Sequence, residues 1–232
     1  MNRRAEKIKT EIRQEQIARA ALDLIARRGL NHLNIAALAR EVGVVPSAIY
    51  RHYSGKDEVL ESVLDLISKI LLANVETVCQ TTPDMLERLH LLLMRHVEVV
   101  RHHAGIPRVI FSEQIFAGSS ARRRRVHQVL EAYLQKIAGI IAEGRRQGQI
   151  RADISPETAA VMFLGLVQPA IILWLMSNGA FDVVRHTERA WRLYRGMLRK
   201  DEHRTCSRVG SRTRNRETKF TATKKDHNYV TE

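Results

Sequence analysis

The stretch from Gly43 to Lys56, GVVPSAIYRHYSGK, constrains the fold more than any other part of the sequence. A glycine marks a turn, a proline opens a very short helix, and a further helix starts directly after Ser54. Ile49 and Tyr53 are four residues apart, so we expect both to face inward, together with Val45. A helix, a glycine turn and a short helix predict a helix-turn-helix, whose second helix fits the major groove of DNA.

The outer face of this short helix has the side chains that such a role needs. Ser47, Tyr50 and Arg51 share that face by their spacing, with Pro46 at its leading edge. Serine and tyrosine can donate to phosphate or base edges, and arginine can bind phosphate or guanine through two hydrogen bonds. An ordinary solvated face on a small amphipathic bundle remains the alternative, because short helix-turn-helix patterns also arise by chance.

The charge of the chain favours a polyanionic partner. The 232 residues have a formal net charge of +13, and residues 1–56 hold eleven Lys and Arg against five Asp and Glu. The excess therefore lies where the DNA groove would be, which favours nucleic acid over a membrane surface. A basic enzyme, or a charge excess confined to one tail, is the alternative interpretation.

The remaining sequence predicts an all-α protein, because strand alternation is missing and the punctuation is that of helix caps. About nine helices are expected, at roughly 8–28, 35–41, 46–52, 56–80, 83–103, 106–116, 120–147, 156–178 and 182–200. Residues 201–232 are polar, with eight Lys and Arg against five Asp and Glu, and we interpret them as a disordered basic tail.

Cysteine content and hydropathy indicate a soluble cytoplasmic protein. Cys79 and Cys206 are too few and too far apart for a disulfide framework. The N-terminus lacks the apolar core of a signal peptide. The most apolar run, Val161–Met176, is too short for a membrane span and contains Gln168 and Pro169, so no membrane partner is predicted.

Residues 17–60 resemble the N-terminal DNA-binding domain of the TetR/AcrR family of bacterial transcriptional regulators. The resemblance rests on the Ala-Ala-Leu and Ile-Ala of the first helix, on Gly29, on Gly43-Val44, and on Tyr50, His52, Tyr53 and Lys56. It implies a DNA-binding domain at 1–56 and a helical effector-binding and dimerisation domain at 57–200. It also implies a homodimeric regulator, in most cases a repressor, that binds double-stranded operator DNA and needs no cofactor.

The resemblance assigns DNA contacts to eight positions of this sequence. They are Asn34, Pro46, Ser47, Ala48, Tyr50, Arg51, His52 and Lys56. Two positions depart from the family pattern, which usually has Thr at Asn34 and Ser at Val45. Asparagine still caps a helix well, whereas valine cannot cap, and Pro46 compensates in part by removing one free N–H group.

The expected helix at 156–178 is apolar nearly all round, so both of its faces must be covered. In the resembling family the last two helices pack against their twofold mates as a four-helix bundle. The interface candidates are Leu166, Val167, Ala170, Ile171, Trp174, Trp191, Tyr194 and Leu198. The alternative is a core helix in a monomer. Pro169 should kink this helix in either case.

We expect a small-molecule effector to bind between the helices that follow the DNA-binding domain. The predicted lining is Leu92, Met94, Arg95, Phe111, Gln114, Ile115, Tyr133, Ile137, Phe163 and Gln168. Because this lining is largely apolar with a few polar tips, the effector should be mostly hydrophobic. The alternative is that the same side chains fill a closed core.

Other candidate sites in the sequence are weaker. His96 and His103 share a helical face but lie two turns apart, which makes a poor metal site, so no metal is predicted. The run Arg122–Arg125 is simplest as a solvated face, and the sharper alternative is a docking site for an anionic effector such as a phosphate-bearing acyl carrier. No paired acid and base or catalytic motif is visible, so we predict no catalytic residue and no enzyme. A DNA-organising protein without an effector and, less favoured, an all-α enzyme are the competing classes.

Overall fold

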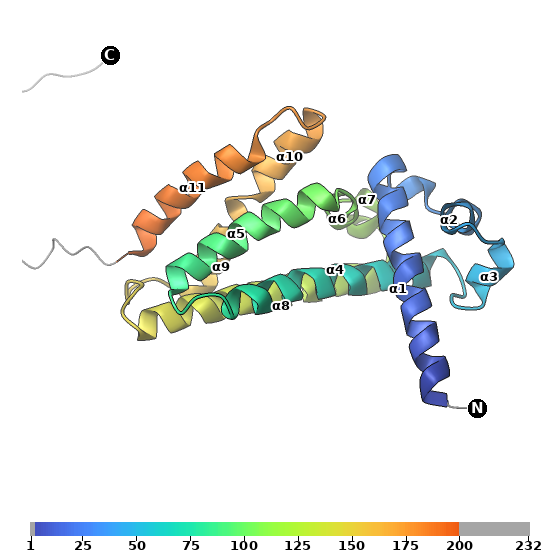
Figure 1. Cartoon of the computed structure of the whole chain (residues 1–232). Helices are drawn as coiled ribbons and strands as arrows, with labels where there is room; N and C mark the ends of the chain where they lie inside the picture. Colours follow the sequence, from blue (N-terminus) through green and yellow to red (C-terminus); the bar gives the residue numbers. More distant parts are fainter. Residues whose placement is uncertain (1–2, 200–232) are drawn as a thin grey trace, which may run out of the picture. The chain divides into compact units, whose positions relative to one another are not determined.

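The computed structural model describes residues 3–199, which are helical almost throughout and contain no named strand (Figure 1). The expected all-α fold is therefore confirmed. The helices are α1 (Arg3–Arg28), η1 (Leu30–His32), α2 (Ile35–Val42), α3 (Pro46–Tyr50), α4 (Lys56–Cys79), α5 (Met85–His102), α6 (Gly105–Ile110), α7 (Glu113–Phe116), α8 (Ser120–Arg146), α9 (Pro156–Gly165), α10 (Gln168–Met176) and α11 (Val183–Leu198). The predicted tail at 201–232 lies outside the described residues.

Two of the predicted helices are each divided in two. The expected helix at 156–178 breaks at Leu166 and Val167, directly before Gln168 and Pro169, which form the first turn of α10. Proline lacks an N–H group and its ring clashes with the preceding turn, so the expected kink at this position is confirmed as a break. The expected helix at 106–116 becomes α6 and α7, because the chain turns extended at Ser112.

The N-terminal helices pack around Ile49 and Tyr53, the inward side chains of the recognition segment at residues 46–53. Ile49 is fully buried and Tyr53 is 3% exposed, as their spacing predicted. The inward position predicted for Val45 is wrong, because this side chain is 63% exposed. Val45 precedes the first helical residue with an extended backbone, so helical periodicity does not apply to it. Gly43 ends α2 with a left-handed φ of 73°.

Helix α4 belongs to both halves of the molecule. It begins at Lys56, beside the recognition segment, and continues to Cys79 without a break. It packs against α1 on one side and against α5 and α8 on the other, as Figure 1 shows for α1 and α8. The predicted boundary between residues 56 and 57 therefore falls inside one continuous helix, which connects the two halves.

Aromatic contacts join α11 to α5 and to α9. The ring of Trp191 stacks on that of His90 in α5 with centroids 5.2 Å apart, and Phe163 meets Tyr194 edge to face. Tyr194 Oη also donates to the carbonyl oxygen of Ala159 at 2.7 Å. The large side chains of α11 therefore serve the core of this chain.

Candidate nucleic-acid interface and effector cavity

The recognition helix α3 presents an exposed polar face at the end of the molecule. Among the eight predicted DNA contacts, the exposed residues are Asn34, Pro46, Ser47, Tyr50 and Arg51, and the half-buried ones are Ala48, His52 and Lys56. Asn34 caps α2, Arg51 and His52 directly follow α3, Lys56 begins α4, and the other four lie on α3, so all eight belong to the helix-turn-helix segment or to the residues that directly follow it. Tyr50 is 57% exposed although it is aromatic, which leaves its hydroxyl free to reach a partner outside the chain.

Asn34 and Lys56, the first and last of these residues, stand where hydrogen bonds order the starts of α2 and α4. Asn34 Oδ1 accepts a hydrogen bond from the Ala37 N–H at 2.8 Å, so asparagine caps α2 as expected. At the start of α4, the backbone N–H and the hydroxyl of Ser54 both donate to Glu58, at 2.6 and 2.8 Å. This contact lowers the pKa of Glu58. Lys56 therefore stands in the first turn of a helix whose end is ordered before any partner binds.

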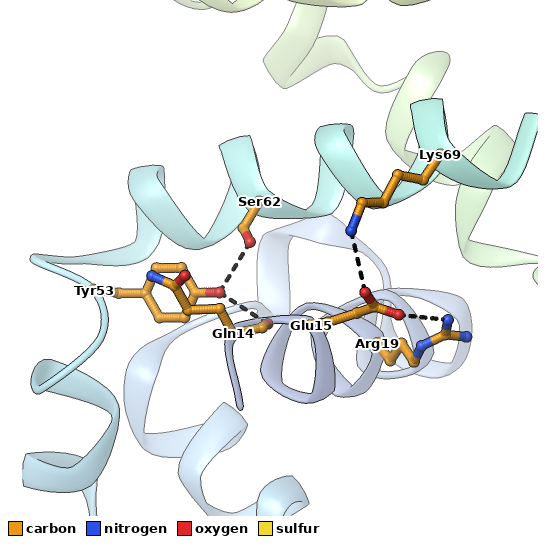
Figure 2. A network of polar contacts seen from close by, with 6 residues as sticks. All are labelled: Gln14, Glu15, Arg19, Tyr53, Ser62 and Lys69. Carbon is orange, nitrogen blue, oxygen red and sulfur yellow. Dashed lines mark hydrogen bonds and ion pairs between the residues drawn. The ribbon is translucent and has the colours of Figure 1, made fainter. Parts of the chain in front are cut away.

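A polar network seen in Figure 2 attaches the recognition segment to α1 and α4. Tyr53 Oη donates to the carbonyl oxygen of Gln14 at 3.0 Å and lies 2.9 Å from Ser62 Oγ. Burial raises the pKa of the Tyr53 phenol, so the group stays protonated and can donate. The side-chain amide of Gln14 donates in turn to the His52 carbonyl oxygen at 3.3 Å. The segment that follows α3 is thus held by two helices, α1 and α4.

Glu15 completes this attachment one residue further along α1. Its carboxylate accepts from Arg19 at 2.8 Å and from Lys69 of α4 at 3.2 Å (Figure 2). The Arg19 hydrogen bond, followed by that from Lys69, lowers the pKa of Glu15. Both cations are more than half exposed, so neither ion pair stabilises the fold much. The ion pair of Glu15 with Lys69 mainly sets the position of α1 on α4.

Two adjoining apolar cavities lie among α4–α10. The inner one, of about 40 Å³, is bounded by residues of α4, α5, α6, α8, α9 and α10, including Leu71, His96, Tyr133 and Gln168. The outer one, of about 390 Å³, is bounded by α6, α7 and the first turns of α8, including Arg123 and Arg124. Ile110, Phe111 and Leu130 border both cavities and therefore lie between them.

The inner cavity contains a buried polar pair. His96 Nδ1 lies 3.1 Å from Tyr133 Oη, and the two rings are stacked with centroids 5.6 Å apart. Burial lowers the pKa of His96 to about 4 and raises that of Tyr133, so both groups are neutral near pH 7. The amide of Gln168 also borders this cavity. A neutral, partly polar wall is thus built into an otherwise apolar space.

The ten predicted pocket residues separate into five locations. Phe111, Tyr133 and Gln168 border the inner cavity, and Phe111 and Ile115 border the outer one. Leu92, Ile137 and Phe163 are fully buried core residues, and Met94 is half-buried, and none of the four borders either cavity. Arg95 is exposed and donates to Asn74 at 3.2 Å. Gln114 donates to Asn31 of η1 and borders a separate, more polar pocket.

The four arginines of the run Arg122–Arg125 have two different roles. Arg122 pairs with Asp57 at 2.7 Å and Arg125 pairs with Asp65, so both connect α8 to α4. Arg123 and Arg124 border the outer cavity. The expected solvated face describes Arg123 and Arg124, which are exposed, but not Arg122, whose side chain is only 14% exposed. Sequence patterns could not reveal the pairing, since Asp57 and Arg122 are 65 residues apart.

The structure corrects the predicted dimer interface. Val167, Ala170, Ile171, Trp191, Tyr194 and Leu198 are at most 4% exposed within the single chain, whereas Leu166 and Trp174 are half-buried. The six buried residues were placed on the wrong side, because a helix that is apolar all round carries no signal for which side faces its own body, whereas Leu166 and Trp174 stay predictions. The outward apolar side chains of α9–α11 are instead Val161, Met162, Ile172, Leu173, Met176 and Leu193.

Two further searches concern a membrane and a metal. The stretch Pro156–Met176 is apolar and long enough to cross a membrane by length and composition alone, although the core helix of a soluble protein meets the same criteria. Within residues 3–199, no group of three or more His, Cys, Asp or Glu side chains is arranged to hold a metal ion.

The fold and its two sites define a helix-turn-helix DNA-binding protein with a helical regulatory domain. A family profile described as "Bacterial regulatory proteins, tetR family" matches residues 17–63, and one described as "YsiA-like protein, C-terminal region" matches residues 65–196. The chain belongs to the TetR family of bacterial regulatory proteins and is a DNA-binding transcriptional regulator.

Individual relatives agree with this assignment. The "Fatty acid metabolism regulator protein" of Bacillus subtilis is 22% identical over 169 residues, which cover 73% of this chain and 87% of that protein. "Nucleoid occlusion factor SlmA" of Vibrio vulnificus is 22% identical over 188 residues, 81% of this chain and 96% of its own. The crystal structure of the transcriptional regulator FadR from Bacillus subtilis in complex with stearoyl-CoA has a TM-score of 0.68 at 21% identity and covers 79% of this chain and 98% of that one. None of these three names describes an enzyme.

Proposed function

We propose that this regulator is a cytoplasmic homodimeric repressor that a fatty acyl-CoA releases from a palindromic operator. The observation that carries the proposal is the pair of adjoining apolar cavities with Arg123 and Arg124 at the outer one. An acyl chain matches the apolar walls, and the phosphates of coenzyme A match the two guanidinium groups. The stearoyl-CoA bound to the similar FadR structure supports the same class of ligand.

On the DNA side, the proposal assigns the contacts to the exposed face of α3 and the residues that flank it. Ser47 and Arg51 would reach base edges, whereas Tyr50 and Lys56 would bind phosphates. Lys56 has a second advantage, because the free N–H groups at the start of α4 also attract an anion. Asn34, Pro46, Ala48 and His52 would complete the surface, and the network around Tyr53 would hold it rigid.

Dimerisation would use the outward apolar side of α9–α11. The exposed side chains Leu173, Met176 and Leu193 are 48%, 78% and 80% accessible in the single chain, which favours burial against a second copy. A twofold dimer would place its recognition helices about one helical turn of DNA apart, or a multiple of it, so the operator should be a palindrome or nearly so.

Release follows if the acyl-CoA binds the arrangement that does not fit DNA better than the one that does. Widening the inner cavity would displace Leu71 and with it α4, whose first residue is Lys56. The ion pairs from Arg122 and Arg125 to α4 provide a second connection. A DNA-organising protein without an effector would not need cavities that border on α4, and the proposal includes no catalytic step.

The test begins with the operator, obtained by selecting genomic fragments that the purified protein retains. Stearoyl-CoA and free coenzyme A are then titrated into the operator complex, and DNA binding is measured by fluorescence anisotropy. Stearoyl-CoA should dissociate the complex and raise the melting temperature of the free protein, and free coenzyme A should do neither at the same concentration. Acyl-CoAs from ten to twenty carbons without effect on either measurement would overturn the proposed effector.

A matched pair of variants tests the site. Arg124→Gln should weaken stearoyl-CoA binding several-fold, since one guanidinium at the outer cavity is lost. Lys136→Gln removes the same charge from an exposed position of the same helix that borders neither cavity, and it should bind as the wild type does. Equal loss in both variants would show that only the net charge matters.

A further inference from the structure

The inner cavity has a polar wall that a plain acyl chain would leave unused. Its side chains are mostly apolar, among them Leu71, Val100 and Ile171, yet His96, Tyr133 and Gln168 border the same space. The three polar groups come from α5, α8 and α10, so the folded chain, and no local pattern, brings them together. A buried polar group normally has a hydrogen-bond partner, because leaving it without one costs about 1–3 kcal/mol.

His96 and Tyr133 together have one hydrogen-bond donor more than their mutual contact uses. A neutral imidazole has one N–H and one acceptor nitrogen, and the phenol has one O–H. The contact between Nδ1 and Oη uses one of the two hydrogens, whichever group donates. The second hydrogen, on Nε2 or on Oη, has no further hydrogen bond within residues 3–199. The side-chain amide of Gln168 also forms no hydrogen bond in this part of the chain.

This pair favours a neutral oxygen over a charged one. The low pKa of His96, caused by its burial, keeps the ring uncharged near pH 7. A carboxylate brought into this space would lose its hydration without meeting a positive charge, which is costly. A hydroxyl or keto oxygen would accept the spare hydrogen, and Gln168 could donate or accept a second bond. A space of about 40 Å³ is large enough for one such oxygen.

The distance between the charged and the polar ends sets the position of this oxygen on the ligand. Arg123 and Tyr133 are both on α8, ten residues apart, which corresponds to about 15 Å along the helix axis. A zigzag carbon chain with bonds of about 1.5 Å advances about 1.25 Å per carbon, so about 12 carbons span the same length. Because the arginines are matched to the phosphates, the pantetheine arm, whose extended length is about the same, spans this distance, and the oxygen should stand on the first few carbons after the thioester.

We propose that His96, Tyr133 and Gln168 form a subsite that selects acyl thioesters bearing a hydroxyl or keto group on the first few carbons after the thioester. This inference rests on the acyl-CoA function proposed above and narrows it to an oxygenated class of ligand. Because Leu71 of α4 borders the same subsite, an oxygen held there places the ligand directly against the helix that begins at Lys56.

The experiment compares three probes on the full chain by isothermal titration calorimetry: stearoyl-CoA, 3-hydroxystearoyl-CoA and 3-oxostearoyl-CoA. The hydroxy and oxo probes should bind about tenfold more tightly than stearoyl-CoA. Equal binding of all three would overturn the subsite while leaving the acyl-CoA function intact. If no probe binds or releases DNA, the proposed function itself fails.

Variants assign the preference to residues. Tyr133→Phe keeps the ring and removes the hydroxyl, so the preference for the oxygenated probes should fall to about twofold or less, with stearoyl-CoA affinity unchanged or higher. Tyr194→Phe is the matched control, because its hydroxyl donates to Ala159 away from the cavity. Gln168→Leu gives an independent reading should Tyr133→Phe fold poorly. A full preference retained in a folded Tyr133→Phe or Gln168→Leu protein would remove that residue from the subsite, and retention in both would overturn the proposal.

Discussion

Arg122 Nη2 lies 2.7 Å from Asp57 Oδ1, so an ion pair joins the first turn of α8 to the first turn of α4. The arginine side chain is only 14% exposed, whereas that of the aspartate is 83% exposed. Asp57 directly follows Lys56, a proposed phosphate contact, and Arg122 directly precedes the two arginines of the outer cavity. This contact is therefore a direct polar connection between the helix ends that carry the two proposed binding sites.

The first prediction concerns this ion pair. Asp57→Asn should leave the affinity for stearoyl-CoA within about twofold. It should raise the stearoyl-CoA concentration that releases half of the DNA by about three- to fivefold, after correction for any change in DNA affinity without ligand. The effect is no larger because an exposed ion pair contributes about 1 kcal/mol at most. The double variant Asp57→Asn/Arg122→Gln should be no worse than either single one. Glu76→Gln, on the exposed side of α4, is the control, and identical release curves for it and Asp57→Asn would rule out the connection.

The second prediction concerns DNA. Tyr50→Ala and Lys56→Ala should weaken binding to operator and to random duplex alike. Lys56→Ala should also reduce the slope of log K against log salt by about 1, because it removes a charged phosphate contact. For the uncharged Tyr50 the slope should change less. Arg51→Ala should instead reduce the preference for operator over random duplex. Lys136→Ala serves as the charge control. Wild-type DNA affinity in a triple variant at 50, 51 and 56 would reject the proposed surface.

The third prediction concerns assembly. Leu193→Glu and Met176→Glu place a charge at the two most exposed apolar positions of α10 and α11, so each should yield monomers that bind operator poorly. Molar mass from light scattering measures the outcome. Ile12→Glu, at a 55% exposed position of α1, should remain dimeric. A wild-type protein that is monomeric at micromolar concentration would contradict the proposed homodimer.

The fourth prediction concerns the close approach of α6 and α1. A Cβ atom on Gly105 would lie 2.3 Å from the Leu22 carbonyl oxygen and 2.8 Å from Leu22 Cδ1. Gly105→Ala should therefore force the two helices apart and lower the free energy of unfolding by about 1–3 kcal/mol, measured in urea. Gly139→Ala, on α8 with open space around it, should leave stability unchanged or raise it by up to about 1 kcal/mol.

The fifth prediction concerns pH. The pKa of His96 is lowered to about 4 in the folded protein, against about 6.5 in an unfolded chain. Between these values the unfolded chain binds a proton that the folded chain does not, so stability is lost as pH falls from about 6.5 towards 4, by roughly 3 kcal/mol at most. His96→Gln should flatten this dependence, and His127→Gln, at an exposed position, should not. Equal pH profiles for the wild type and His96→Gln would contradict the buried neutral state.

The sequence by itself determined the local structure, because caps and breakers act within a few residues. Asn34, Gly43 and Pro46 fixed the helix-turn-helix, and Pro169 marked the break before α10. The inward positions of Ile49 and Tyr53 followed from helical spacing. The inward position predicted for Val45 was wrong, because this residue precedes α3 and helical spacing does not apply to it.

Only the tertiary structure decided which surfaces meet. Helices that are apolar on every side do not reveal which side of α9–α11 faces outward. Trp191 and Tyr194 were therefore predicted at the dimer interface, although each is at most 4% exposed within the single chain. The cavity with His96, Tyr133 and Gln168 needs α5, α8 and α10 at once. The ion pair of Asp57 and Arg122 joins residues that no helical period relates, because long-range contacts depend on how whole helices pack.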